Sequence, residues 1–97
     1  MATFIALVNF TEQGIKNVKE SPQRAKAFEE LAKKLGGTVK ALFWTQGKYD
    51  IVTILEAPDE QTVSAIMLSV SSYGNVHGQT LRAFDAAEFG AILKKMG

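Results

Sequence analysis

Residues 38–57 read TVKALFWTQGKYDIVTILEA, two apolar runs separated by a glycine-containing turn. Residues 38–46 and 49–57 are rich in β-branched and aromatic residues, which favour β-strands. Only Gly47 and Lys48 separate the two runs, and strands joined so closely must pair antiparallel as a hairpin. The chain is therefore expected to be organised around a β-hairpin.

Patterns on both sides of the hairpin predict two further strands and three helices. Strands are expected at residues 3–10 and 75–84. Helices are expected after Ser21, after Pro58 and after Asp85, because apolar residues then recur at helical spacing. The order β-α-β-β-α-β plus a terminal helix predicts an α+β, ferredoxin-like antiparallel sheet in a single domain over residues 1–97, with helices on one face.

Particular residues set the helix ends. Ser21 is expected to cap the first helix, with Pro22 in the first helical position. Gly74 is expected to close the second helix. Asp85, with Glu88 three residues later, predicts a capping box at the start of the last helix.

The expected strands carry apolar residues on both faces. Antiparallel sheets with one solvated face normally alternate apolar and polar residues, and these strands do not. In the first strand, one face is expected to carry Phe4, Ala6, Val8 and Phe10 and the other Ile5 and Leu7. In the second strand, the two faces are expected to carry Val39, Ala41 and Phe43 and, opposite them, Leu42 and Trp44. In the third strand, they are expected to carry Tyr49, Ile51 and Leu55 and, opposite them, Val52 and Ile54.

The helices can cover only one face of such a sheet, so the other face needs a different cover. An exposed apolar face of this kind exceeds the few hundred Å² that monomers usually tolerate. The economical cover is a second copy of the chain, sheet against sheet, about a two-fold axis. The alternative cover is the terminal helix, with apolar face Phe89, Ile92, Leu93 and Met96, folded back over a monomer. We expect a homodimer or a higher oligomer.

Composition excludes several function classes. The 97 residues include no cysteine and one histidine, so no thiolate metal site, thiol nucleophile or multi-histidine metal centre can form. Eleven basic residues against ten acidic ones give a formal charge of +1, without the strong positive charge of a dedicated nucleic-acid binder. The apolar run at residues 3–8 is too short for a signal peptide or a membrane span. We expect a cytoplasmic protein without metal, cofactor, nucleic acid or membrane.

One motif carries a resemblance to a known family. The turn Gly47-Lys48-Tyr49-Asp50 matches the Gly-x-Tyr-Asp motif of the GYD domain family, a family of undetermined function. Residues 10–16, 20–25, 74–76 and 80–84 are similar to that family as well, so the resemblance covers nearly the whole chain. It implies a dimeric α+β barrel, as in the ligand-binding domains of Lrp-type regulators and in small cofactor-free monooxygenases. It supplies no established catalytic residues.

Five side chains are candidates for a ligand site, each with a structural alternative. They are Trp44, Tyr49, Asp50, His77 and Arg82. Trp44 suits a pocket wall or core packing, and Tyr49 and Asp50 suit a pocket mouth or the turn itself. His77 is the one side chain that titrates near neutrality, and Arg82 needs an anionic partner if it is buried.

No nucleotide-binding or hydrolase motif accompanies these residues. The leading hypothesis is a non-catalytic, small-molecule-binding or regulatory homo-oligomer. One alternative is a cofactor-free oxygenase or isomerase for an apolar or phenolic substrate, with His77 as base and Arg82 or Tyr49 steadying an anion. That alternative requires His77 and Tyr49 to converge on one cavity. Another is an assembly module without a ligand.

Overall fold

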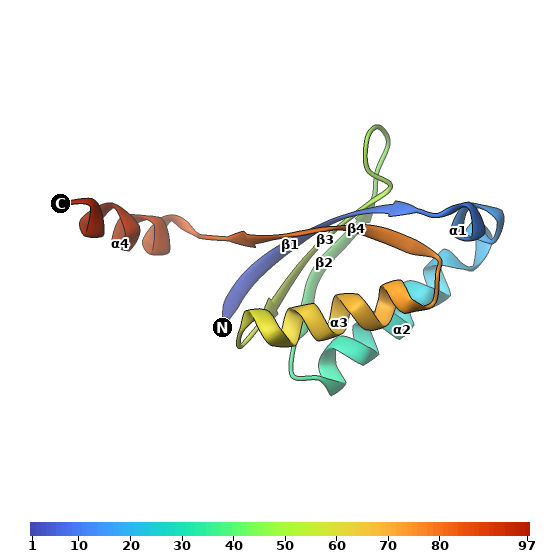
Figure 1. Cartoon of the computed structure of the whole chain (residues 1–97), viewed down its shortest axis with the longest axis horizontal. Helices are drawn as coiled ribbons and strands as arrows, with labels where there is room; N and C mark the ends of the chain where they lie inside the picture. Colours follow the sequence, from blue (N-terminus) through green and yellow to red (C-terminus); the bar gives the residue numbers. More distant parts are fainter.

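The computed structural model describes residues 1–97 and confirms the α+β, ferredoxin-like arrangement (Figure 1). The four strands form one antiparallel sheet in the order β2-β3-β1-β4. The elements are β1 (Ala2–Phe10), α1 (Glu12–Lys16), a 3₁₀ turn (Val18–Glu20), α2 (Ser21–Lys34), β2 (Thr38–Trp44), β3 (Ile51–Ala57), α3 (Glu60–Ser72), β4 (Val76–Ala83) and α4 (Ala86–Met96).

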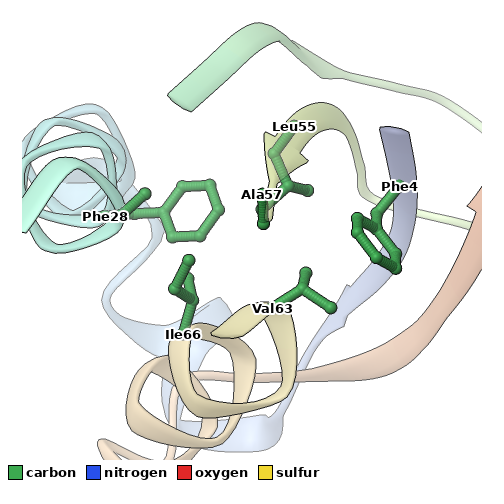
Figure 2. Close-up of a cluster of buried hydrophobic side chains, with 7 residues drawn as sticks. Phe4, Phe28, Leu55, Ala57, Val63 and Ile66 are labelled. Atoms are coloured by element: carbon green, nitrogen blue, oxygen red, sulfur yellow. The ribbon is translucent and has the colours of Figure 1, made fainter. Parts of the chain in front are cut away.

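Helices α2 and α3 lie against one face of the sheet and form the core with it. Figure 2 shows Phe28 of α2 and Ile66 and Val63 of α3 directed at the central strands β1 and β3. Alternate residues of β1 and β3 are buried on this face, as period-two alternation requires. The main buried cluster consists of Phe4, Phe28, Ala32, Leu55, Ala57, Val63 and Ile66.

Strand β2 departs from strict alternation at one point. Val39 pairs with Leu55, but Ala41 already pairs with Ile54, so Lys40 is an extra residue in the ladder. Because of this bulge, the residues before it point to the opposite face of the sheet from the one that strict alternation along β2 would give them. The expectation that Val39 faces the same way as Ala41 and Phe43 is therefore wrong. Val39 packs against the core cluster on the helix side of the sheet.

The connection between β2 and β3 is longer than the two-residue turn that the sequence suggests. Strand β2 ends at Trp44 and β3 begins at Ile51, so Tyr49 belongs to the loop. The Thr45 amide donates to the Asp50 carbonyl at 2.8 Å, and the Asp50 amide donates to the Val8 carbonyl at 2.9 Å. The Thr45–Asp50 bond closes the hairpin one step beyond the Trp44–Ile51 pair, and the six residues 45–50 form the loop.

The helix ends agree with expectation except at Ser21. The capping box of Asp85 and Glu88 is present at α4. Gly74 follows α3 with a φ of 83°, a left-handed conformation that suits glycine. Helix α2, however, continues directly from the 3₁₀ turn, and its N-cap is Glu20, with no side-chain hydrogen bond. Ser21 is the first helical residue and is buried, so its hydroxyl is not a helix cap. Pro22 is accordingly in the second helical position, not in the first as expected.

The second face of the sheet carries no helix. This open face, defined here as Ile5, Leu7, Ala41, Phe43, Val52, Ile54 and Leu81, consists of residues that alternate with the core-facing positions. Helix α4 does not cover it but stands away from the sheet at the end of β4 (Figure 1). Phe89, Leu93 and Met96 on α4 are therefore exposed. No helix of the chain combines the length and the apolar character needed to cross a bilayer.

Candidate functional site

A cavity of about 460 Å³ lies between α2, α3 and the helix side of the sheet. Eleven of its fifteen lining residues are hydrophobic. Its volume falls in the range of pockets that bind small molecules, and its lining has the usual apolar character of such pockets. This cavity is the candidate site.

The apolar lining follows from the periodicity of the elements around it. Phe28 and Leu31 of α2 and Met67 and Val70 of α3 recur at a spacing of three, which places each pair on one helix face. Ile51 belongs to the buried alternation of β3 and forms part of the opposite wall. The helix stripes that build the core thus also build the cavity.

The other four lining residues are polar: Ser21 and Arg24 at the start of α2, Thr53 on β3 and Asn75 in the turn after α3. Tyr73, at the end of α3, is one of the eleven hydrophobic residues and adds a hydroxyl group. Thr53 is almost fully buried, and its hydroxyl donates to the Ala41 carbonyl at 2.9 Å. Arg24 donates through Nη2 to the Asn17 carbonyl at 3.1 Å and to the Gly14 carbonyl at 3.5 Å. These backbone carbonyls hold the guanidinium beside the cavity.

Helix α1 and the turn after α3 are joined near this polar end of the cavity. The Gln13 side-chain amide donates to the Tyr73 carbonyl at 3.0 Å and to Asn75 Oδ1 at 2.9 Å. The Thr11 amide donates to the Asn75 carbonyl at 3.0 Å. Gly14 is buried against the same carbonyl, where a Cβ atom would be 1.9 Å from the oxygen. The turn that carries Tyr73 and Asn75 is therefore fixed in place.

Three of the five candidates from the sequence lie near the β2–β3 hairpin. Trp44 is half exposed, and its indole nitrogen donates to the hydroxyl of Ser21, a residue of the cavity lining. Asp50 accepts a hydrogen bond from the Phe10 amide at 2.9 Å, which ties the hairpin to β1. Tyr49 lies in the loop with the Lys48 ammonium 5.8 Å from its ring centroid. None of the three lines the cavity itself.

The other two candidates lie on β4, far from each other along the strand. His77 pairs with Asn9 and is exposed. Its position in the register places it on the same side as Gln79 and Leu81, away from the cavity. Arg82 makes an ion pair with Glu88 at 3.1 Å and donates to the Thr3 carbonyl at 3.2 Å. Its guanidinium lies 4.6 Å from the Phe84 ring centroid, so Arg82 fixes the start of α4.

The structure therefore does not bring the five candidates together around this cavity. Neither His77 nor Tyr49 lines it, so the convergence that the oxygenase or isomerase alternative requires does not occur there. No group of three or more His, Cys, Asp or Glu side chains is placed to hold a metal ion.

The sequence analysis did not select Arg24, Tyr73 or Asn75. A signal for Arg24 was nevertheless present in the sequence. Ser21, Arg24, Phe28 and Leu31 follow one another at spacings of three and four, so the two polar residues continue the apolar stripe of α2. Polar residues on a buried helix face mark a place where the interior is polar or hollow. No comparable periodicity marks Asn75, which lies in a turn.

Sequence comparison finds matches over nearly the whole chain. The family model described as GYD domain matches residues 4–93. A Thermus thermophilus protein named "Glutamine synthetase and cystathionine beta-lyase binding protein" is 38% identical over 95 residues, which cover 97% of this chain and all of that protein.

Two solved structures share the fold. The leucine response regulatory protein LrpA of Mycobacterium tuberculosis superposes with a TM-score of 0.66 at 10% identity over 88% of this chain. This chain spans only about half, 51%, of that regulator. The protein TTHA0845 of Thermus thermophilus has a TM-score of 0.57 at 23% identity, over 89% of this chain and 96% of its own. At these identities the two structures support the fold alone.

Proposed function

This chain belongs to the GYD domain family, and from that premise we propose that it is a non-catalytic regulatory domain that binds a small molecule and works as a homo-oligomer. The cavity between the helices and the sheet is the observation that carries the proposal. Its lining is dominated by hydrophobic side chains, and Ser21, Arg24 and Thr53 each make at least one hydrogen bond within the protein. Such a lining suits retention of an apolar molecule and offers no general base next to a nucleophile.

The open face of the sheet supports the homo-oligomer part of the proposal. Phe43 and Leu81 are 59% and 42% exposed there, and β1 and β3 add a central apolar strip. Exposed apolar surface of this extent is typical of an interaction site. A second copy would offer the same apolar surface, and two such faces packed together would bury it on both subunits.

The name of the Thermus thermophilus relative adds a coarse partner class. That protein is named for binding two enzymes, and its similarity extends over the whole of its length. We extend to this chain only the property of binding other proteins. Helix α4 supports this extension, because its apolar residues Phe89, Leu93 and Met96 are exposed on an element that stands clear of the sheet.

Filling the cavity tests the small-molecule part of the proposal. 1-Octanol is a neutral, apolar probe, and its binding is followed by the fluorescence of Trp44, the one tryptophan of the chain. The wild type is expected to bind octanol saturably. Ala25→Phe and Val70→Phe place a ring into the cavity from α2 and α3 and are expected to abolish saturable binding.

Ala65→Phe is the matched control, since Ala65 is exposed on α3 and does not line the cavity. It is expected to bind octanol like the wild type. Circular dichroism spectra of all variants check that the helices are retained. Saturable binding that survives in both filled variants, or its absence from the wild type, contradicts the proposal.

A further inference from the structure

We propose that the cavity takes an apolar carboxylic acid in its ionised form, with the carboxylate held by Ser21 and Arg24 at the start of α2. This inference rests on the proposed function of the cavity as a small-molecule site and adds the chemical class of its ligand. The inference rests on the two polar side chains Ser21 and Arg24, which lie on one face of α2, and on the charge of the cavity lining.

Ser21 has a hydrogen-bond donor without an acceptor. The residue is 5% exposed, and its hydroxyl oxygen accepts the Trp44 indole N–H at 2.9 Å. A serine hydroxyl also carries one proton to donate, and no protein atom accepts it. Because Ser21 lines the cavity, the natural acceptor for this proton is an oxygen of a bound molecule.

Arg24 lies one helical turn after Ser21 and also lines the cavity. Its side chain is 27% exposed, and two backbone carbonyls orient its Nη2 atom. A guanidinium has five N–H donors, and these contacts leave several of them unused. The two carbonyls use both hydrogens of Nη2, so the donors that remain are those of Nη1 and Nε. A carboxylate in the cavity can accept one charge-assisted hydrogen bond from these donors and a second hydrogen bond from the Ser21 hydroxyl.

Glu20 is the existing acidic neighbour of this arginine. Its Oε2 atom lies 3.7 Å from Arg24 Nη1, and its side chain is 64% exposed. An exposed pair at this distance contributes little, because water screens it. A carboxylate inside the cavity would lie in a less polar medium, where the same charges attract more strongly. The ligand can therefore compete with Glu20 for the guanidinium.

The charge of the lining selects an anion over a cation. Arg24 is the one ionisable group with a full charge at neutral pH among the lining residues, and none of them is acidic. Thr53 cannot act as a second anchor through its proton, because its hydroxyl already donates to Ala41. The carboxylate is thus expected at the α2 end, with the apolar part against Leu31, Met67 and Val70.

The test compares octanoate with 1-octanol, which have equal chain lengths and differ in charge. The wild type is expected to bind octanoate about tenfold or more tightly than octanol, since a charged hydrogen bond contributes about 1.5–3 kcal/mol. Arg24→Gln is expected to reduce octanoate affinity about tenfold or more and to change octanol affinity much less, because octanol carries no charge. Ser21→Ala is expected to lower the affinity for octanoate several-fold.

Two further variants separate a direct role of Arg24 from a structural one. Glu20→Gln leaves Arg24 in place, removes its competitor and is expected to strengthen octanoate binding. Lys26→Gln is the matched control, since it removes one positive charge from an exposed position of the same helix outside the cavity lining. Octanoate affinity is expected to be unchanged in this variant.

The outcomes distinguish the two proposals. Equal or weaker binding of octanoate than octanol in the wild type overturns the carboxylate inference while the small-molecule site stands. An equal loss of octanoate affinity in Arg24→Gln and Lys26→Gln also overturns it, because the loss would then come from the lower net charge of the protein and not from a contact with Arg24. Absence of binding by both probes overturns the proposed function itself.

Discussion

The indole N–H of Trp44, at the end of β2, donates to the buried hydroxyl of Ser21, at the start of α2, with 2.9 Å between Nε1 and Oγ. The bond joins two elements that are 23 residues apart in the chain. It explains why Ser21 is buried instead of capping its own helix, and it holds β2 against the polar end of the cavity.

Removal of one partner of this bond is expected to destabilise the protein. Ser21→Ala leaves the indole N–H without its acceptor and is expected to lower the free energy of unfolding by about 1 kcal/mol. Trp44→Phe removes the same hydrogen bond and a larger ring, so it is expected to lower the free energy of unfolding by a comparable amount plus a loss from packing. Urea denaturation at one fixed protein concentration measures the free energy of unfolding of both variants. The double variant completes a double-mutant cycle. Strictly additive losses would show that the two residues do not interact.

Self-association is expected to depend on the open face. Ile54 lies on this face between Ile5 of β1 and Ala41 of β2, so Ile54→Lys places a charge at its centre. The wild type is expected to sediment as a dimer or larger, and the variant as a single subunit, because burying an unpaired charge is costly. Gln61→Lys on the exposed side of α3 is the control. A wild type that sediments as one subunit at micromolar concentration would refute self-association.

Two glycines are expected to respond oppositely to alanine. At Gly14 a Cβ atom would lie 1.9 Å from the Asn75 carbonyl oxygen, so Gly14→Ala must displace the backbone beside the cavity and is expected to cost about 1–3 kcal/mol. At Gly90 of α4 a Cβ meets nothing within 4 Å, so Gly90→Ala is expected to stabilise the helix by about 0.5–1 kcal/mol. Thermal unfolding measures both, and a neutral Gly14→Ala would contradict the close packing of α1.

Asp59 is expected to make α3 sensitive to acid. Hydrogen bonds from the Thr62 side chain and from the Thr62 amide, at 2.8 Å, hold the pKa of Asp59 below its ordinary value. A carboxyl group with a lowered pKa in the folded state stabilises the protein above its unfolded pKa, and this contribution disappears as the pH falls through the folded pKa.

The variant Asp59→Asn keeps an acceptor at the cap and removes the titration. Wild type is therefore expected to have the higher melting temperature at neutral pH, by a small margin because the site is exposed. The difference is expected to vanish in acid. A difference that persists unchanged at acid pH would show that the charge of Asp59 plays no part.

Helix α4 is expected to depend on Arg82 for its position. The guanidinium joins Glu88 of α4 to the Thr3 carbonyl of β1 and packs on Phe84. Arg82→Gln removes the ion pair and the planar fork, so amide hydrogen exchange over residues 86–96 is expected to accelerate. Exchange in β1 and β3 should stay as in the wild type. Unchanged exchange in α4 would show that another contact, such as a partner subunit, holds this helix.

Local patterns were sufficient for the order of the strands and the three longer helices, for the core and for most helix ends, but not for the short helix α1. The stripe of α3 through Val63 and Ile66, the alternation of β1 through Phe4 and Ala6, and the capping box at Asp85 were all predicted and found. Each depends on residues close together in the chain, whose spacing decides which face they share. The resemblance to the GYD domain family rested on local motifs too, and the family match over residues 4–93 confirms it.

The site could not be read in the same way, because long-range contacts decide it. The bulge at Lys40 moves Val39 to the core side, and Tyr49 lies in the loop between β2 and β3 instead of in β3. Serine is a common N-cap residue, but the hydroxyl of Ser21 accepts a hydrogen bond from Trp44, which is far along the chain. Arg24 lines a cavity only because α3 and the sheet enclose space beside it. Spacing along the chain thus assigned most residues to a face, whereas the packing of faces against one another decided which residues border the cavity.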